Sequence, residues 1–476
     1  MVDEHVAIQN LSDEVLLYIF LFLRPRRTSF PSRIKSSLTW EWHRLAHVCR
    51  RWRYLIFAFP RRLGLGLVTS RSQRGTNLDL WPPLPICICY DSPWKPSLED
   101  EQDVITTLEQ SDRIFEIKLT ISNSLLEKSN VWMESFPALE CLCLRSPYHH
   151  STALPSGFLG GSALASRRLR YIILKRVSVP TLPQLLLSSR GLIHLYLGED
   201  ALSGDTSLSP AVLTAALSAA SRLEFLHVHL PSNIFHEEQE STDSDSPPLN
   251  LVVLPALIYL RSVGPNENLE DFFSRIHAPL LEKICVGLPQ QYDQPLDIPR
   301  LSQFISRTEH MSSLPFQTSI SLDENCFTIS HEFGIRGHVC VEMTCDLGFL
   351  QVSQVDHICK QLSPLTSDVE RVSIDVNITP QYLPDETEIA RWLQLFRLFN
   401  GAQELELGSD HTLYEAHDSP KMGQEVFPAL RILRLNGFDL QVPRFIKSFV
   451  AERELTGRPI TVIRTCGGFE SSPESA

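Results

Sequence analysis

The chain has 476 residues, of which 43% are hydrophobic, so it is long enough to bury a large core or a long repeated one. Its formal net charge of −13 is uneven: residues 1–75 carry 13 Lys and Arg against 5 Asp and Glu, a balance of +8, and the remainder carries 30 against 51, a balance of −21. A basic N-terminal part on an acidic body argues against a nucleic-acid-binding protein, whose binding domain would carry a broad basic face. It favours docking of that part on an acidic partner.

The first predicted element is a helix over residues 11–23. Ser12 suits the N-cap, and Asp13 and Glu14 suit the positive end of the helix dipole. The apolar residues that share a helix face by their spacing are Leu11, Val15, Leu16, Ile19, Phe20 and Leu23, while Leu17, Leu21 and Phe22 cover much of the opposite side. A small module has enough core for one apolar side only, so the other side predicts a partner.

A second helix is predicted over residues 45–56, with an apolar stripe formed by Leu45, Val48, Cys49 and Trp52. The neighbouring arginines are Arg50, Arg51 and Arg53. They are explained either as part of a basic docking surface or simply as the solvated side of this helix.

The two stretches carry the pattern Leu-x-x-Glu-x-Leu-x-x-Ile-Phe-x-x-Leu followed by Val-Cys-Arg-x-Trp, at Leu11, Glu14, Leu16, Ile19, Phe20, Leu23, Val48, Cys49, Arg51 and Trp52. This pattern resembles an F-box, the helical module that docks on the Skp adaptor of cullin-RING (SCF) ubiquitin ligases. The resemblance implies adaptor binding by Leu11, Leu16, Ile19, Phe20, Leu23, Val48, Cys49 and Trp52. The chain departs from the pattern at Ser12, where Pro is usual, and at residues 24–40, which are longer than the usual turn. The alternative is a helical hairpin that only packs inside one core.

The rest of the chain repeats a pairing of helix and strand. Strands are predicted at residues 63–69, 84–90 and 113–120, with a helix at residues 98–112. A segment of the form apolar-x-x-apolar-x-apolar then recurs, starting at Ile114, Leu139, Leu169, Leu192, Leu223, Leu281, Val369 and Leu430. The first five starts are 25, 30, 23 and 31 residues apart, which leaves room for one strand, a loop and one helix. Further helices are predicted within residues 210–222, 269–276, 301–305, 386–399 and 442–453.

This succession is similar to a leucine-rich-repeat solenoid of irregular kind, as in F-box proteins with leucine-rich tails, fungal ones in particular. Such repeats place Asn or Cys three residues beyond the last apolar position. Here only Asn377 fits, and prolines occupy that place at Pro147, Pro231, Pro265 and Pro289. We therefore expect stacked strands and helices without a regular horseshoe. An ordinary α/β domain with leucine-rich strands is the alternative.

The predicted fold class is α/β, with N-terminal all-α F-box helices followed by a leucine-rich-repeat-like solenoid of alternating strands and helices. The predicted domains are a flexible N-terminus (1–8), an F-box domain (9–62, with residues 24–40 as an inserted loop), the solenoid (63–465) and a flexible tail (466–476). Residues 235–248 are acidic, rich in Ser and poor in apolar residues, so they predict a disordered loop. Residues 311–343 hold strand-like runs without a clear helix and predict a hairpin-like interruption.

No motif for catalysis stands out. Gly160-Gly161-Ser162 lacks the closing Gly of a nucleophile elbow, because Leu164 stands there. The one-residue spacing of Cys87 and Cys89, within an apolar run, favours small hydrophobic residues on one strand face over a zinc site. Cys141 and Cys143, and His227 and His229, share this spacing. The sequence predicts no enzyme, no cofactor and no metal site.

Strand alternation predicts a binding surface instead, because the residues between the core positions point outward onto one shared face. The aromatic and basic residues expected there, and proposed to bind substrate, are Tyr171, His194, Tyr196, Phe225, His227, Tyr259 and Arg261. Glu116 and Lys118 are expected on the same face. Such residue types dominate interface hot spots. The alternative is that residues 235–248 or a tail cover this stripe.

The resemblance and these residues together predict the substrate-recognition subunit of an SCF E3 ubiquitin ligase, whose F-box docks on a Skp-family adaptor, and through it on a cullin-RING ligase, and whose repeats bind a protein substrate. The main alternative is a non-catalytic repeat scaffold or regulatory protein that is not coupled to ubiquitination. A hydrolase carried on a repeat body has no motif in its favour. The 11 scattered Cys, the lack of an apolar run of roughly 18 residues and the absence of a cleavage pattern predict a cytoplasmic or nuclear protein that binds no membrane.

Overall fold

The structure, a computed structural model, describes residues 10–22, 41–63, 65–71, 84–91, 97–128, 130–147, 152–155, 157–161, 168–199, 201–202, 209–231, 251–289, 297–311, 315–323, 326–334, 336–344, 358–361, 369–377, 394, 396–408, 426–436 and 444–465. The chain forms two compact units, residues 1–206 and 207–476. Within the described ranges, no helix is both long and apolar enough to cross a membrane.

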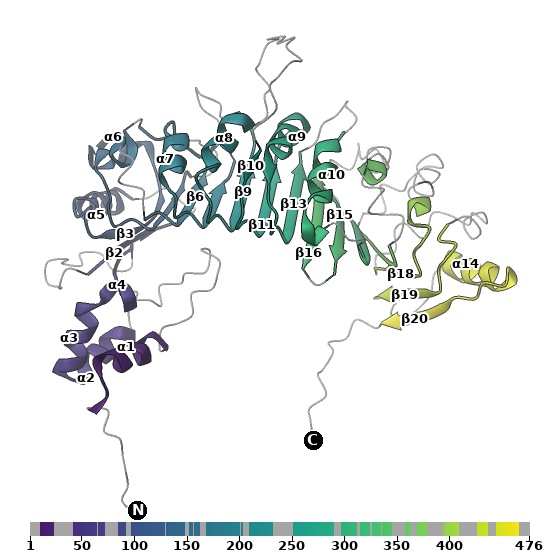
Figure 1. Ribbon diagram of the computed structural model, residues 1–476, viewed down its shortest axis with the longest axis horizontal. Coiled ribbons are helices and arrows are strands. Elements are labelled where there is room, and N and C mark those ends of the chain that lie inside the picture. Colours follow the sequence, from purple (N-terminus) through teal and green to yellow (C-terminus); the bar gives the residue numbers. More distant parts are fainter. Residues whose placement is uncertain are drawn as a thin grey trace, which may run out of the picture. The chain divides into compact units, whose positions relative to one another are not determined.

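The described residues of the first unit begin with the helices α1 (Asp13–Phe22), α2 (Glu41–Val48), α3 (Arg50–Ala58) and α4 (Pro60–Leu63), which we call the head (Figure 1). The single helix expected over residues 45–56 is two helices. Cys49 separates them because its backbone is extended, with φ −157° and ψ 171°, and it caps α3 by accepting a hydrogen bond from the Trp52 N–H at its Sγ, 3.4 Å away. Apolar spacing alone does not reveal such a break, because the stripe continues across it.

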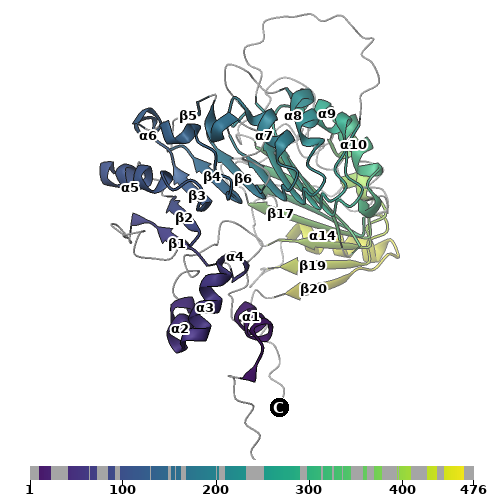
Figure 2. The ribbon, with the colours of Figure 1, turned by 60° about the vertical axis from the view of Figure 1, so that its left-hand side comes forward.

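After the head, the first unit contains a parallel sheet in which the strand order is β1 (Leu67–Thr69), β2 (Ile86–Tyr90), β3 (Ile114–Thr120), β4 (Cys141–Arg145), β6 (Tyr171–Lys175) and β8 (His194–Leu197). The helices α5 (Leu98–Leu108), α6 (Asn123–Lys128) and α7 (Leu182–Ser188) lie on one side of it (Figures 1 and 2). Short 3-10 helices at Asn130–Met133 and Phe158–Gly161, and a small parallel pair, β5 (Thr152–Ala153) with β7 (Val177–Ser178), complete this unit. The predicted alternation of strands and helices is confirmed here.

The second unit starts with three parallel strands, β9 (Phe225–His229), β11 (Tyr259–Val263) and β13 (Lys283–Leu288), and ends with four, β17 (Arg371–Asn377), β18 (Glu404–Leu407), β19 (Ile432–Asn436) and β20 (Thr461–Thr465). Its described helices include α8 (Pro210–Leu217), α9 (Asn266–Arg275), α10 (Pro299–Ser306) and α14 (Arg444–Leu455), with 3-10 turns at Glu309–Met311 and Arg397–Phe399. The pair β10 (Val252–Val253) and β12 (Ile276–His277) forms a small parallel sheet. The helices predicted within 210–222, 269–276, 301–305 and 442–453 are confirmed, with shifted ends.

An antiparallel group interrupts the parallel strands of the second unit. The strands β14 (Gln317–Asp323), β15 (Cys326–Phe333) and β16 (Gly337–Thr344) pair antiparallel with one another, while β16 runs parallel to β13 and β14 parallel to β17. Antiparallel neighbours need only a tight turn, and Gly334 supplies one with φ +59° between β15 and β16. The hairpin-like interruption predicted over residues 311–343 is therefore confirmed.

The described core is apolar and continuous along the strands. In the first unit the residues Ile117, Leu142, Ile172 and Leu195 lie in register on neighbouring strands, and each is fully buried. In the second unit Phe273 contacts Phe272 and Phe304, with ring centroids 5.9 and 5.3 Å away, and so joins α9 to α10. The helices thus bury their apolar sides against one another and the sheet, which is what stacking of strand–helix units requires. Residues 24–40, 235–248, 386–393 and 466–476 lie outside the described residues, so the predictions made for them stay predictions.

The N-terminus of α5 offers a test of local stability. Ser97 and Asp100 form a capping box: the Ser97 hydroxyl accepts from the Asp100 N–H at 3.1 Å, and the Asp100 carboxylate accepts from the Ser97 N–H at 3.0 Å. We expect Ser97→Ala to lower the free energy of unfolding by about 1 kcal/mol, and Ser97→Gly by a few tenths. Urea denaturation of the three proteins measures this. Equal losses for Ala and Gly would contradict a role for the hydroxyl as a cap.

A buried histidine in the antiparallel group makes stability depend on pH. His331 is fully buried in β15, and its Nδ1 lies 2.8 Å from the Thr318 hydroxyl. Burial, and secondarily the nearby His338, lower the pKa of His331 to about 4. An unfolded histidine titrates near about 6.5, so below that pH the unfolded chain binds the extra proton and the folded chain does not. The contribution of neutral His331 to the free energy of unfolding is therefore fully present above about pH 6.5 and is lost as the pH falls towards 4.

We therefore expect the free energy of unfolding to fall by about 2 kcal/mol between pH 7 and pH 5 on account of His331. Urea denaturation at several pH values measures the slope. The variant His331→Gln should flatten the slope by close to one proton. An unchanged slope in His331→Gln would show that this ring titrates normally.

Candidate functional site

Four exposed apolar side chains of the head lie along α1. Val15, Tyr18, Ile19 and Phe22 are 43%, 57%, 38% and 86% exposed. Their spacing of i, i+3, i+4 and i+7 places them on one side of the helix, which we call the exposed α1 face. Leu16, Leu17 and Phe20 are buried on the other side. The helix is thus apolar all round, and the head covers only one of its sides.

The orientation of α1 is fixed by contacts with α3. The Arg51 guanidinium donates to the Asp13 carboxylate at 2.8 and 2.5 Å and to the Leu11 carbonyl at 2.6 Å. On the buried side, the Phe20 ring meets the Trp52 ring edge-on, with centroids 4.9 Å apart. Because α1 is held on that side by an ion pair, in which two guanidinium nitrogens donate to one carboxylate oxygen, and by an aromatic contact, its other side stays turned away from the head.

The residues predicted to bind the adaptor therefore differ in how far they are exposed. Leu16 and Phe20 are buried in the head, and Leu11 and Trp52 are half-buried. Ile19, Val48 and Cys49 are exposed, and Leu23 lies outside the described residues. Their contact with an adaptor stays a prediction. The residues predicted from apolar spacing include residues from both sides of α1. Spacing alone does not distinguish the buried side from the exposed side of a helix that is apolar all round.

Four exposed aromatic residues in the described part of the head are missing from the predicted site. Tyr18 and Phe22 belong to the exposed α1 face, Tyr54 on α3 is 72% exposed, and Phe59 at the end of α3 is 42% exposed. The F-box-like pattern does not include these positions. The set 15, 18, 19 and 22 does carry the spacing of one helix face, and this was the available signal.

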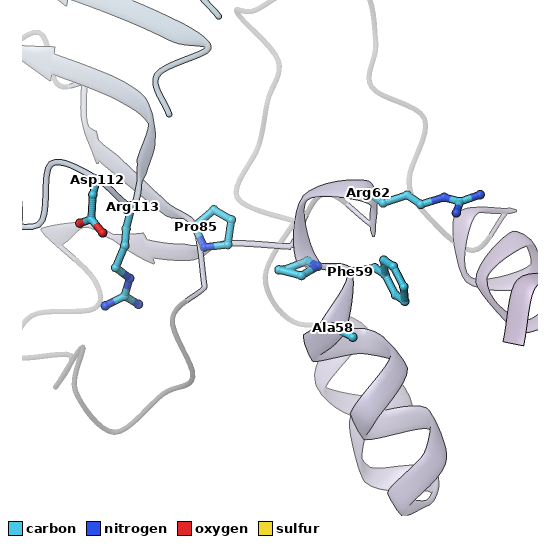
Figure 3. A pocket seen from close by; sticks show the side chains of 7 residues that line it. Ala58, Phe59, Arg62, Pro85, Asp112 and Arg113 are labelled. Carbon is cyan, nitrogen blue, oxygen red and sulfur yellow. The ribbon is translucent and has the colours of Figure 1, made fainter. Parts of the chain in front are cut away.

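A cavity of about 490 Å³ lies where α3 and α4 approach the start of β2 and the turn before β3 (Figure 3). Its lining residues are Ala58, Phe59, Pro60, Arg62, Pro85, Asp112 and Arg113. Arg113 donates to the Leu84 carbonyl at 3.1 Å and to the Gln110 side chain at 2.5 Å, and the Arg62 guanidinium lies 5.7 Å from the centre of the Tyr18 ring. The arginines thus hold chain segments together, and the lining contains no nucleophile with a neighbouring base.

The predicted substrate-binding residues lie on the outward face of the strands, meaning the strand residues that alternate with the buried core. In the first unit Tyr171 and His194 are in register, with ring centroids 6.3 Å apart, and Lys175 lies 4.8 Å from the centre of the Tyr196 ring. Burial lowers the pKa of His194 to about 4, so its ring is neutral at neutral pH. This part of the outward face is aromatic, and the Lys175 ammonium lies over the Tyr196 ring.

In the second unit Phe225 and Tyr259 are in register, with ring centroids 6.2 Å apart, and His227 pairs with Arg261 in the next outward row. The Lys283 ammonium lies 6.0 Å from the centre of the Tyr259 ring. Arg261 donates to the Glu342 carboxylate at 3.0 Å. The structure thus brings Tyr171, His194 and Tyr196 together in one unit, and Phe225, His227, Tyr259 and Arg261 together in the other.

The outward face of β3 differs from its prediction. Glu116 and Lys118 alternate with core residues as expected, but they are only 3% and 7% exposed. Their side chains form an ion pair of 2.6 Å. Burial disfavours the charge of Lys118, but the Glu116 carboxylate outweighs that effect and raises the pKa of Lys118. The two residues therefore form a buried ion pair and are not available to a ligand as free charges.

Four thiols surround this ion pair. Cys87 and Cys141 are in register with Glu116 on the neighbouring strands, and Cys89 and Cys143 are in register with Lys118. Burial raises the pKa of all four, that of Cys143 to about 12, so they are protonated and unreactive. Across the part of the chain that the structure describes, no group of three or more His, Cys, Asp or Glu is placed to hold a metal ion.

Comparison with known proteins gives little. No model of a protein family matches the chain, and no curated protein matches it. Among solved structures, the crystal structure of the leucine-rich repeat-containing protein LegL7 from Legionella pneumophila is similar at 14% sequence identity and a TM-score of 0.29, over 72% of this chain and 97% of that chain. The function therefore has to be argued from the residues and contacts of this chain.

Proposed function

We propose that this chain is the substrate-recognition subunit of an SCF E3 ubiquitin ligase. The head docks on a Skp-family adaptor, and the outward face of the strands binds a protein substrate. The proposal joins the F-box-like pattern of the sequence to one structural observation, the exposed α1 face.

The exposed α1 face supports docking through its energetics. Its four side chains are Val15, Tyr18, Ile19 and Phe22. Burying a large apolar side chain completely contributes about 1.5–3 kcal/mol, so leaving several of them in water on one short helix forgoes a large part of the available stabilisation. Single exposed apolar residues are ordinary, but several on one helix face mark an interaction site. The basic balance of residues 1–75 adds attraction to an acidic adaptor.

The outward face supports protein recognition through its residue types. Tyr171, Tyr196, Phe225 and Tyr259 are half-buried, with aromatic neighbours or a cation against their rings. Aromatic and Arg residues in this state contribute most of the affinity in many protein interfaces. A receptor of this kind needs no catalytic residue, because it raises the local concentration of substrate lysines near the ubiquitin-transfer enzyme.

We expect Tyr196→Ala, Phe225→Ala and Tyr259→Ala together to abolish substrate capture, because they remove three large aromatic contacts, while adaptor binding persists. The measurement is affinity purification of the intact chain from cells, with quantification of co-purified clients and of the adaptor. Leu455→Ala, an exposed apolar residue at the end of α14, is the control and should change neither. Unaltered capture by the triple variant would place the substrate site elsewhere.

The alternative is a non-catalytic repeat scaffold or regulatory protein that acts without ubiquitination. The lack of any matching family model favours it, because an F-box close to the common pattern would be expected to match one. Co-purification of cullin with a ubiquitinated client supports the receptor, whereas capture of partners without cullin supports the scaffold.

A further inference from the structure

Two cysteines of the second unit face each other directly across neighbouring strands. Cys285 on β13 and Cys340 on β16 are partners in the parallel register, and both thiols are free. Neighbouring strands lie about 4.8 Å apart, and a disulfide needs Cα atoms about 4.4–6.8 Å apart, so the backbone already has the spacing of a disulfide. Among the strand pairs that the structure describes, this is the one register position that holds two cysteines.

The surroundings of the pair favour a thiolate at Cys285. The Cys340 thiol donates a hydrogen bond to the Cys285 sulfur, and together with the charge of Arg261 this outweighs burial and lowers the pKa of Cys285 to about 7. The same hydrogen bond, with burial, raises the pKa of Cys340. Arg261 is next to Cys285 in the register, and its Nε is buried without a hydrogen-bond partner in the described part of the chain. Cys285 thus supplies the thiolate that attacks first, and Cys340 supplies the thiol that reacts second.

We propose that Cys285 and Cys340 are an oxidation site, at which a peroxide converts the free thiols into a reversible disulfide between β13 and β16. The Cys285 thiolate attacks one peroxide oxygen; an S–O bond forms, the O–O bond breaks, and the departing hydroxide takes a proton to become water. Cys340 then loses its proton and attacks the Cys285 sulfur; the S–S bond forms, the S–O bond breaks, and the second oxygen leaves as water. The two thiols lose two electrons and two protons, and the peroxide accepts them.

Three of the other described thiols provide an internal comparison. Cys87, Cys141 and Cys143 are as buried as Cys285, but their pKa values are raised and their register partner on β3 is Glu116 or Lys118, not a cysteine. Reactivity towards peroxides follows thiolate character, so these three should resist oxidation. This inference does not depend on a role in ubiquitination. The site lies on the outward face beside Arg261, so oxidation changes the surface near the predicted substrate residues.

The test uses the intact, reduced protein, treated with hydrogen peroxide, alkylated, digested without reductant and analysed by mass spectrometry. We expect a cross-linked peptide that joins Cys285 to Cys340 and that disappears on reduction. Before oxidation, Cys285 should be alkylated at pH 7 about tenfold faster than an ordinary thiol, because about half of it is ionised against roughly 3% at a pKa of 8.5. Its rate should follow a titration with a midpoint near 7.

Two variants separate the roles of the sulfurs. Cys340→Ser keeps a hydroxyl donor beside Cys285, so Cys285 should still be oxidised but should stop at the sulfenic acid, which dimedone traps. The control Cys141→Ser should leave the 285–340 cross-link unchanged. Absence of the cross-link in the folded wild-type protein, or alkylation of Cys285 no faster than that of Cys141, would overturn the proposal, and neither result depends on how a variant folds.

Discussion

Replacing both Ile19 and Phe22 by Asp is expected to weaken binding to a purified Skp adaptor by at least about a hundredfold, or about 2.7 kcal/mol. Both side chains belong to the exposed α1 face, where they are 38% and 86% exposed. In a docked complex each new carboxylate would be buried without a partner, which costs several kcal/mol. In the free protein the carboxylates stay in water, so we expect little change in stability. Calorimetric or interferometric titration of the adaptor measures the affinity.

The choice of Phe22 over its neighbour Phe20 matters for this experiment. Phe20 is buried against Trp52, so Phe20→Asp would disrupt the head and weaken any binding for the wrong reason. A matched control is Leu98→Asp at the first position of α5, which places the same charge on an exposed apolar residue outside the head. Unweakened binding by the double variant, with the control behaving as wild type, would show that the exposed α1 face does not dock on the adaptor.

Glu116→Ala is expected to lower the free energy of unfolding by about 3–5 kcal/mol, because it leaves the Lys118 ammonium buried without its partner. The two side chains are 4% and 9% exposed and lie 2.6 Å apart. Lys118→Met should be costly for the same reason, since it strands the carboxylate. The double variant Glu116→Leu with Lys118→Met should recover most of the loss, because replacing a whole buried ion pair by apolar residues is often close to neutral. Urea denaturation of the wild type, Glu116→Leu, Lys118→Met and the double variant completes a double-mutant cycle, and Glu116→Ala is measured beside them.

An exposed ion pair of the same unit serves as the reference. Arg176 and Glu199 lie 2.7 Å apart, but their side chains are 31% and 58% exposed. Glu199→Ala should therefore cost only about 0–1 kcal/mol, because water screens the pair. A loss for Glu116→Ala no larger than for Glu199→Ala would mean that the burial of the first pair is not maintained in solution.

The sequence predicted the alternation of strands and helices well, because each element carries its own apolar period. The antiparallel group at β14–β16 was also visible, since residues 311–343 hold strand-like runs without a helix between them. The break at Cys49 was not, because it depends on one residue's backbone conformation inside a continuous apolar stripe. Propensity and period describe faces of elements, whereas caps and breaks depend on single hydrogen bonds.

The candidate sites were only partly predictable. Strand alternation placed Tyr171, Phe225 and Tyr259 on the outward face, where the structure has them. It also placed Glu116 and Lys118 there but gave no sign that they would be buried, because burial depends on what packs over a strand and not on its own period. The sequence also did not predict that Cys285 and Cys340 lie opposite each other on neighbouring strands. Their register is set by strands separated by the whole of β14 and β15, and no local pattern encodes it.

The most direct test of the proposed receptor is affinity purification of the intact chain from its own cells, with proteasome activity blocked, followed by identification of co-purified proteins. The proposal predicts that a Skp adaptor, a cullin and at least one ubiquitinated client are recovered with the wild-type chain, and that all three are lost or sharply reduced with Ile19→Asp and Phe22→Asp. Recovery of partners without adaptor or cullin, at the same level from wild type and variant, would contradict it.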